Sequence, residues 1–275
     1  MRETALTIAG SDPTGGAGLQ MDLRVFHHFG VYGLSAVAAL TAQNTFKVGA
    51  VTGVAGRFLE EQLDTLLNDI RPGALKTGML YSSGAVRAVV KAVKGFALRN
   101  LVIDPVAVSS TGTPLMEEGA LEVLREELLP LARVITPNVP EACALSGIPA
   151  GSEEDIEKVA VRLKELGPDV VIITGGHSGR KVSPAPAAGT IELVYDGHAF
   201  LRIPGKRTPG EFHGTGCAFS AAVTALLAKG VPVADAAVAA KDFVQEAIGR
   251  ASPFGRGMRL LPVEHLTEMK GKCPR

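Results

Sequence analysis

Short apolar segments alternate along most of the chain with longer segments in which apolar residues recur at helical spacing. The short segments predict strands at residues 5–9, 35–40, 50–54, 74–77, 101–104, 134–136, 170–174, 191–195 and 199–203. The periodic segments predict helices at residues 18–29, 58–70, 83–94, 117–129, 153–165, 215–229 and 233–250. Strands that are apolar throughout, as at Val170-Val171-Ile172-Ile173, are typical of a parallel sheet covered on both faces. The pattern therefore predicts an α/β fold with a mostly parallel sheet.

The pattern changes late in the chain. The strands predicted at 191–195 and 199–203 are joined through Asp196-Gly197, which predicts an antiparallel hairpin. Stretches rich in Pro, Gly or Ser at 183–189 and 205–212 flank it and are predicted to be loops near the active site. Because we find no internal repeat and no domain boundary, we expect residues 1–275 to form a single domain.

Composition and charge narrow the range of functions. The 28 Lys and Arg residues balance the 28 Asp and Glu residues, and no long basic cluster occurs, which argues against nucleic acid or an acidic membrane as the main partner. The three cysteines have no paired spacing, so neither a disulfide framework nor a zinc site is expected. With no signal-peptide core and no apolar run of about 20 residues, we expect a cytoplasmic protein.

Glycine is the unusual component, with 32 residues, or about 12% against an average of about 7%. One glycine loop, from His213 to Cys217, leads directly into a segment that is apolar nearly all round, which predicts a buried helix. The free N–H groups and the dipole at such a helix start favour an anion at Gly214 to Cys217. The alternative is an ordinary helix start.

Cys217 stands in the first turn of that predicted helix. There the helix dipole favours the thiolate and can lower the thiol pKa, which would make Cys217 a base or a nucleophile. The alternative is a small buried apolar residue, which is how free cysteine often behaves.

A second glycine loop runs from Gly10 to Gly18 between the first predicted strand and helix. It has neither the Gly-x-Gly-x-x-Gly spacing of a dinucleotide fold nor the Gly-x-x-x-x-Gly-Lys-Ser/Thr of a Walker A loop. With Asp12 and Asp22 nearby, the loop suits contact with a small polar ligand, or else forms an elaborate turn with solvated carboxylates.

Oxygen-bearing side chains also follow two later strands. Asp104 ends the strand at 101–104, and Asn138 and Glu141 follow the strand at 134–136 with a spacing of three, which places both on one side of a helical turn. Such groups can hold a hydrated Mg²⁺ ion through water. The alternatives are a turn cap for Asp104 and a helix-dipole charge for Glu141.

Seven motifs occur together in one order: Ala9-Gly10-Ser11-Asp12-Pro13 to Gly15-Gly16-Ala17-Gly18, Ala42-Gln43-Asn44-Thr45, Gly78-Met79-Leu80, Asp104-Pro105-Val106, Thr136-Pro137-Asn138 to Glu141, Gly175-Gly176-His177 and His213-Gly214-Thr215-Gly216-Cys217. In this order they resemble the hydroxymethylpyrimidine/phosphomethylpyrimidine kinases of thiamine biosynthesis, within the ribokinase superfamily. The resemblance implies a three-layer αβα sandwich of ribokinase type. It also implies a homodimer that uses ATP with Mg²⁺ to phosphorylate the hydroxymethylpyrimidine and then its monophosphate.

The resemblance also implies roles for individual residues. Cys217 would face the acceptor hydroxyl, and Gly214, Thr215 and Gly216 would form the anion hole for the transferred phosphoryl group. Hydrogen bonds to the pyrimidine would come from Asp22 and Gln43, and the pocket would be lined by Gly10, Met79 and Val106. The nucleotide side would comprise Asp104, Asn138, Glu141, Thr174, Gly176 and Lys241, with Mg²⁺ held by Glu141 and Asp104 through water. Thr174 stands where the family commonly has Lys.

Two alternative functions remain at this point. A pyridoxal kinase of the same superfamily would also act on an aromatic nitrogen ring that bears a hydroxymethyl group, but Cys217 and Ala42-Gln43-Asn44 favour the pyrimidine. A sensor that binds the pyrimidine without catalysis would leave the anion hole without a purpose.

Overall fold

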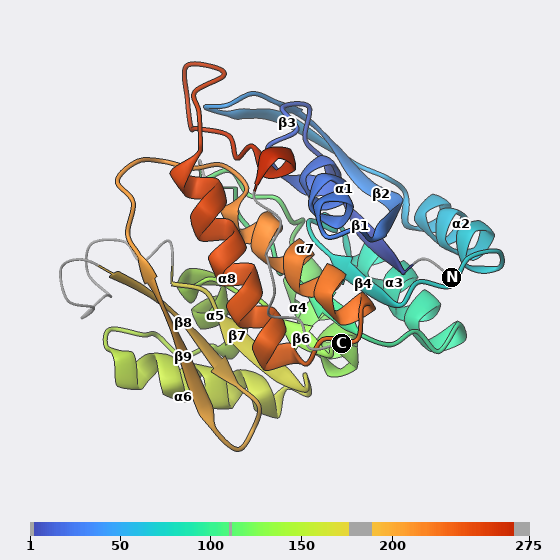
Figure 1. Ribbon diagram of the computed structural model, residues 1–275. Coiled ribbons are helices and arrows are strands. Elements are labelled where there is room, and N and C mark those ends of the chain that lie inside the picture. Colours follow the sequence, from blue (N-terminus) through green and yellow to red (C-terminus); the bar gives the residue numbers. More distant parts are fainter. Residues whose placement is uncertain (1–2, 110–111, 176–188, 267–275) are drawn as a thin grey trace.

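Nine strands form one sheet in the computed structural model, which describes residues 3–109, 112–175 and 189–266. The strand order is β3-β2-β1-β4-β5-β6-β7-β8-β9 (Figure 1). The strands are β1 (Thr4–Ser11), β2 (Tyr32–Gln43), β3 (Val48–Gly53), β4 (Ala74–Thr77), β5 (Leu101–Ile103), β6 (Val134–Ile135), β7 (Val170–Ile173), β8 (Gly189–Tyr195) and β9 (Phe200–Lys206). All nine strands predicted from the sequence are present.

The middle of the sheet is parallel, from β2 through β1, β4, β5 and β6 to β7. At one edge β8 runs antiparallel to β7, and β9 runs antiparallel to β8, so the predicted late hairpin is confirmed. At the other edge β3 runs antiparallel to β2. The loop predicted at 183–189 lies outside the described residues except for Gly189, which begins β8, and β9 continues to Lys206 inside the second predicted loop.

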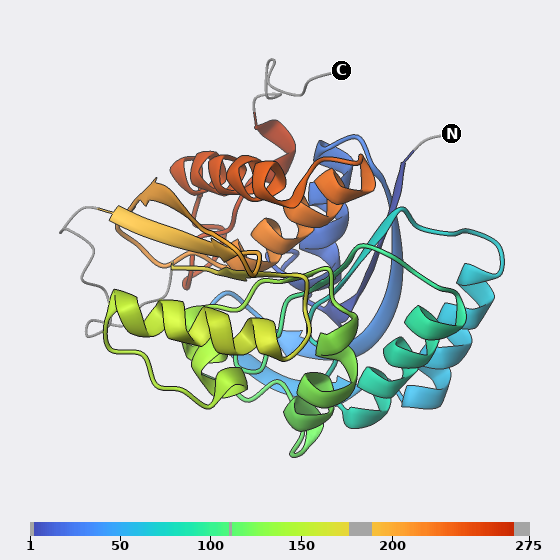
Figure 2. The same cartoon turned by 90° about the horizontal axis from the view of Figure 1, so that it is seen from below.

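Helices cover both faces of the sheet, and Figure 2 shows the three layers. The helical elements are α1 (Gly18–His28), α2 (Gly56–Leu67), α3 (Ser83–Gly95), α4 (Ala120–Val123), η1 (Leu124–Leu128), η2 (Leu129–Leu131), α5 (Val139–Ser146), α6 (Glu153–Glu165), α7 (Thr215–Ala228), α8 (Val233–Gly249) and η3 (Val263–His265). On one face, α1, α7 and α8 pack against the sheet, and α2 to α6 pack against the other. The predicted αβα sandwich is confirmed.

The strands serve two apolar cores because successive side chains point to opposite faces. In β5, Leu101 and Ile103 join the core under α2 to α6, whereas Val102 joins the core under α1, α7 and α8. This explains why the central strands are apolar without alternation.

The helix predicted at 117–129 is wrong in its details. The chain there forms the short helix α4, one π-helical turn (η1) and the 3₁₀ turn η2. Pro130 accounts for the ending, because proline lacks the N–H that would continue the helical ladder and its ring crowds the preceding turn. Helix α5, which the strand and helix pattern did not include, begins at Val139.

The helices of the described residues are too short or too polar to span a membrane. Across residues 3–109, 112–175 and 189–266, none combines the length and the apolar character needed to cross a bilayer.

Candidate functional site

The predicted site residues gather where the parallel strands end. Gly10 lies at the end of β1, and Asp104 and Thr136 follow β5 and β6 directly. In open α/β sheets, ligands bind outside these carboxyl ends. The fold therefore brings the strand-end motifs, which are far apart in sequence, to one edge of the molecule.

The two glycine loops meet there, backbone against backbone. A Cβ atom at Gly214 would lie 1.8 Å from the carbonyl oxygen of Gly16, and one at Gly18 would lie 2.3 Å from that of Gly10. Gly214 and Gly18 also have positive φ angles, 80° and 57°, which disfavour residues with a side chain. Glycine is therefore required at Gly214 so that the two loops can touch, and at Gly18 so that the first loop can close on itself.

Asp12 ties the first loop together and links it to the second. Its carboxylate accepts hydrogen bonds from the Thr14 N–H and hydroxyl and from the Ala17 N–H. The ring of His213 contacts the same carboxylate at 2.7 Å. Burial alone would raise the pKa of Asp12, but the bonds from His213 and Thr14 outweigh it and hold the pKa below its usual range. Asp12 is thus an ionised, buried organiser of the loops and not a solvated turn residue.

The start of α7 has the features of an anion site. Gly214 is the N-cap residue, and no described side chain caps the helix there. The first helical hydrogen bond runs from Ala218 N–H to the Gly214 carbonyl, so the three N–H groups before it belong to the uncapped end. Apart from its chain neighbours and the backbone of its own helix, no described atom lies within 4 Å of the Cβ position at Gly216. Space for an incoming group is therefore present beside that glycine.

A buried lysine that the sequence reasoning missed lies beneath this helix start. Lys76, in β4, has no exposed surface, and its Nζ lies 2.8 Å from Asp22 Oδ1 and 3.6 Å from Asp104 Oδ2. Burial alone would lower the pKa of Lys76, but the charge of Asp22 and its neighbours outweighs burial and raises the pKa above its usual value. A charged residue inside the short strand Ala74–Thr77 was the available signal, because lysine is almost never fully buried without a partner.

Hydroxyl groups complete this buried network. Thr7 on β1 donates to Asp22 Oδ2 at 2.6 Å, and Ser220 on α7 donates to Asp104 Oδ2 at 2.9 Å. Burial raises the pKa of Asp22, with Lys76 and Thr7 acting against it. Asp22 is fully buried and its two oxygens already have partners, so its predicted bond to the pyrimidine would have to share them; that contact stays a prediction.

Cys217 is half-buried above the network, in the first turn of α7. Burial raises the pKa of its thiol to about 12, although Lys76 and a hydrogen bond from the Gly18 backbone act in the opposite direction. The lowered pKa predicted from the helix dipole is therefore wrong for this structure. The protein holds Cys217 as a neutral thiol, because withdrawal from water and the nearby carboxylates outweigh the favourable charges.

Three residues predicted to line the acceptor pocket, Gly10, Met79 and Val106, lie together. Met79 belongs to a small apolar cluster that Val106 contacts, and its sulfur lies 3.1 Å from the Cβ position at Gly10. Gln43, at the end of β2, contacts the His213 ring through its amide nitrogen at 3.1 Å. His213 thus connects Gln43 to the loop that carries Cys217, a link that sequence reasoning did not identify.

On the nucleotide side, three predicted residues lie together. Asn138 and Glu141 form a capping box at the start of α5, each side chain bonded to the other residue's backbone N–H. Thr174 follows β7 and pairs with Asn138 as an isolated bridge. Burial and the nearby Asp104 carboxylate raise the pKa of Glu141 to about 8.

Lys241 has a buried partner that the sequence did not reveal. Its Nζ lies 2.7 Å from both carboxylate oxygens of Glu192 and donates to the Thr190 hydroxyl at 2.9 Å. Its charge is thus balanced within the protein, and a contact with nucleotide phosphates stays a prediction. Gly176, the remaining predicted nucleotide residue, lies outside the described residues.

Asp104 and Glu141 could hold Mg²⁺ only together with further ligands. In the described part of the chain, no three His, Cys, Asp or Glu side chains cluster closely enough to hold a metal ion. The raised pKa of Glu141 beside Asp104 shows two acids whose repulsion a cation would relieve. Mg²⁺ commonly uses one or two carboxylates together with waters and substrate phosphates, so this pair fits it.

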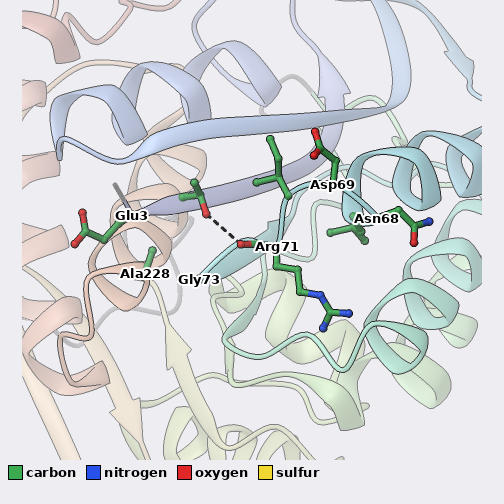
Figure 3. A pocket seen from close by; sticks show the side chains of 9 residues that line it. Glu3, Asn68, Asp69, Arg71, Gly73 and Ala228 are labelled. Atoms are coloured by element: carbon green, nitrogen blue, oxygen red, sulfur yellow. Dashed lines mark hydrogen bonds between the residues drawn. The ribbon is translucent and has the colours of Figure 1, made fainter. Parts of the chain in front are cut away.

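A cavity of about 740 Å³ lies at the opposite edge of the sheet. Figure 3 shows Glu3, Arg71, Gly73 and Ala228 around it, where β1 and β4 begin and α7 ends. None of the predicted site residues lines it. The carboxyl edge, with its anion site and buried charges, remains the candidate site.

An uncapped helix start in a glycine loop, an apolar cluster and a pair of acids lie at the carboxyl edge of an αβα sandwich, an arrangement suited to a small-molecule phosphotransferase. The sequence model of the phosphomethylpyrimidine kinase family matches residues 12–263, and the chain belongs to this family. It is 40% identical over 256 residues to the hydroxymethylpyrimidine/phosphomethylpyrimidine kinase of Bacillus subtilis, covering 92% of each chain. It is 41% identical over 266 residues to a thiamine biosynthesis bifunctional protein of Geobacter sulfurreducens, covering 96% of this chain but only about half, 52%, of that protein.

Solved structures agree with this assignment. A phosphomethylpyrimidine kinase from Clostridium difficile superimposes with a TM-score of 0.78 at 35% identity, covering 90% of this chain and 100% of that one. An ADP complex of Bacillus subtilis pyridoxal kinase gives a TM-score of 0.83 at 36% identity, covering 95% and 97%. The family, the ribokinase-like fold and the kinase class predicted from the motifs are therefore confirmed.

Two glycines in the same loop should respond differently to alanine. Gly214→Ala forces a side chain onto the Gly16 carbonyl at positive φ, and we expect it to lower the free energy of unfolding by about 2 kcal/mol or more. Gly216→Ala, where space is open, should change it by no more than about 1 kcal/mol yet reduce turnover. Chemical denaturation and ADP release, measured on both variants, test this; a stable Gly214→Ala protein would contradict the loop contact.

The thiol state of Cys217 can be measured directly. In a Cys143→Ser/Cys273→Ser background, iodoacetamide should modify Cys217 at pH 8 at least about 100-fold more slowly than free cysteine, because a pKa of about 12 leaves little thiolate. The rate should still rise about tenfold per pH unit between pH 8 and 10. Mass spectrometry follows the modification, and a plateau below pH 9 would show that the helix start lowers the pKa after all.

Proposed function

We propose that this protein transfers the γ-phosphoryl group of ATP to the hydroxymethyl group of 4-amino-5-hydroxymethyl-2-methylpyrimidine and then to the resulting monophosphate, in thiamine biosynthesis. The observation that carries the proposal is the glycine loop at α7, which places Cys217 at an uncapped helix start. The curated relative in Bacillus subtilis bears the name of this bifunctional kinase, and the match covers 92% of both chains.

Gly214, Thr215 and Gly216 supply the charge stabilisation in this proposal. Phosphoryl transfer through a loose transition state depends mainly on alignment and on neutralising charge at the phosphoryl oxygens. The N–H groups at the start of α7 are fixed by the loop contact at Gly214, so they need little rearrangement when the phosphoryl group arrives. The acceptor hydroxyl approaches the phosphorus as the bond to the ADP oxygen breaks.

Cys217 orients the acceptor and does not begin the reaction as a base. A neutral thiol cannot remove a proton, but it can hold the hydroxyl in line by hydrogen bonding. In a loose transition state the hydroxyl proton leaves late, when the new bond to phosphorus has made it acidic, and it can pass to a phosphoryl oxygen. No phosphocysteine forms in this scheme.

The metal and nucleotide are proposed to bind beside the acceptor. Glu141 and Asp104 would hold Mg²⁺ through water, with Asn138, Thr174, Gly176 and Lys241 on the nucleotide side. Mg²⁺ supplies neutralisation of the phosphate charge when it is bound. The capping box fixes Glu141 on the backbone of Asn138, so its carboxylate is held in place before the nucleotide arrives.

We also propose that the chain works as one domain in a cytoplasmic homodimer, the state that the family resemblance implies. Its balanced charge supports small molecules as partners and argues against nucleic acid or membrane surfaces. A sensor without catalysis is disfavoured by the uncapped helix start, and steady ADP release would exclude it.

Pyridoxal is the alternative acceptor, because a pyridoxal kinase shares the fold closely. The wild-type protein should release ADP faster with the hydroxymethylpyrimidine than with pyridoxal. Gln43→Leu should lower kcat/KM for the pyrimidine far more than for pyridoxal, because the Gln43 amide can pair with the amino group and adjacent ring nitrogen. Parallel ADP assays decide this. Equal losses would make Gln43 structural, and a wild-type preference for pyridoxal would establish the alternative.

Removing the Cys217 thiol tests its role in orienting the acceptor. Cys217→Ala should lower kcat by about 10²-fold, the size of a positioning loss, while pyrimidine affinity stays within about tenfold. Cys217→Asp should retain more activity than Cys217→Ala, because a carboxylate can also accept the hydroxyl hydrogen bond. Steady-state kinetics and calorimetric binding give the two quantities, and wild-type turnover by Cys217→Ala would return the residue to a packing role.

A further inference from the structure

Lys76 occupies the junction between the two halves of the site. The acceptor half contains β1 and α1, and the nucleotide half contains β5 to β7. Lys76 contacts Asp22 in the first and Asp104 in the second, and it lies beside Thr7 in the register of β1 and β4. Through Asp104 and Ser220 the same network reaches the first turns of α7.

The network carries a net negative charge and reaches the start of α7, where the transferred phosphoryl group is proposed to bind. Burial raises the pKa of Asp22, but the Lys76 ammonium at 2.8 Å acts against burial and favours the ionised carboxylate. With both carboxylates ionised, the network has a formal charge of −1, and neither Lys76 nor Asp22 has exposed surface. A buried charge acts over a longer range than an exposed one because little solvent screens it. Without the Lys76 ammonium, two negative charges would lie beneath a site that has to accept phosphoryl oxygens.

The acceptors of the two proposed reactions interact with this charge to different extents. The first acceptor is a neutral alcohol, whereas the second is a phosphate monoester with nearly two negative charges at pH 7. Any negative charge left uncompensated in the network repels the second acceptor more than the first. Both acceptors share the pyrimidine ring, so a change in ring contacts affects them alike.

We propose that Lys76 is a positioning residue whose ammonium holds Asp22 and Asp104 in place and balances their charge, and that this balance allows the site to accept a phosphorylated substrate in the second step. The inference rests on the proposed function. It predicts that the ratio of second-step to first-step kcat/KM follows the formal charge of the network and is independent of stability.

Three variants vary that charge. Lys76→Met leaves two carboxylates, a charge of −2, and should lower the ratio about tenfold. Asp22→Asn leaves one ammonium and one carboxylate, a charge of zero, and should raise the ratio about tenfold. These sizes correspond to a unit change in the charge of the network acting on the nearly two charges of the monophosphate across roughly 10 Å, at an effective dielectric constant of about 40, between the values for a protein site and for water. The double variant restores −1 and should return the ratio to the wild-type value, although its stability and both absolute rates differ.

The assay uses the purified pyrimidine and its monophosphate as acceptors at saturating Mg-ATP. Calorimetric Kd values for both acceptors without nucleotide give a second readout and should follow the same order. A ratio that stays constant in Asp22→Asn would overturn the inference, as would parallel loss of both rates in Lys76→Met. If Lys76→Met does not fold, Asp22→Asn and the double variant decide alone. A wild-type protein inactive on both acceptors would instead refute the proposed function and, with it, this inference.

Discussion

The contact between the two glycine loops is the constraint on which the site depends. Gly214 can approach the Gly16 carbonyl only because it has no side chain and can take a positive φ, and this approach seats the start of α7 at the end of β1. The bond between Asp12 and His213 holds the same loops from the side. A helix start supplies a useful field only within its first turn, so the loops determine where that field acts.

Burial and charge compete throughout this edge of the sheet, and the outcome differs from group to group. For Asp12, hydrogen bonds outweigh burial and the carboxylate stays ionised. For Cys217, burial outweighs both Lys76 and the Gly18 contact, and the thiol stays neutral. The pKa of Glu141 is also raised, because the neighbouring Asp104 carboxylate adds to the effect of burial. A site built from such opposed effects is sensitive to any cation or anion that a substrate brings.

The sequence predicted the sheet well because strand position depends on local apolar pattern, and β4 and α6 match their predicted bounds. It failed where the deciding contact is distant in sequence. The pairs Lys76–Asp22 and Lys241–Glu192 join residues 54 and 49 positions apart, and no local pattern marks such partners. For the same reason the helix dipole at Cys217 and the burial of its helix were visible in the sequence, whereas the carboxylates of Asp104 and Asp22, which add to the effect of burial, were not.

The buried network connects the loops of the site to the interior of the fold. Its members come from β1, α1, β4, the residue that follows β5, and α7, so elements far apart in sequence each contribute one polar group to the same place. Removing one partner of a buried ion pair is strongly destabilising, and replacing the whole set with apolar side chains often is not. Stability alone therefore does not require these charges here. In the role proposed for Lys76, its ammonium, fixed between two carboxylates, keeps the local potential from rejecting phosphate.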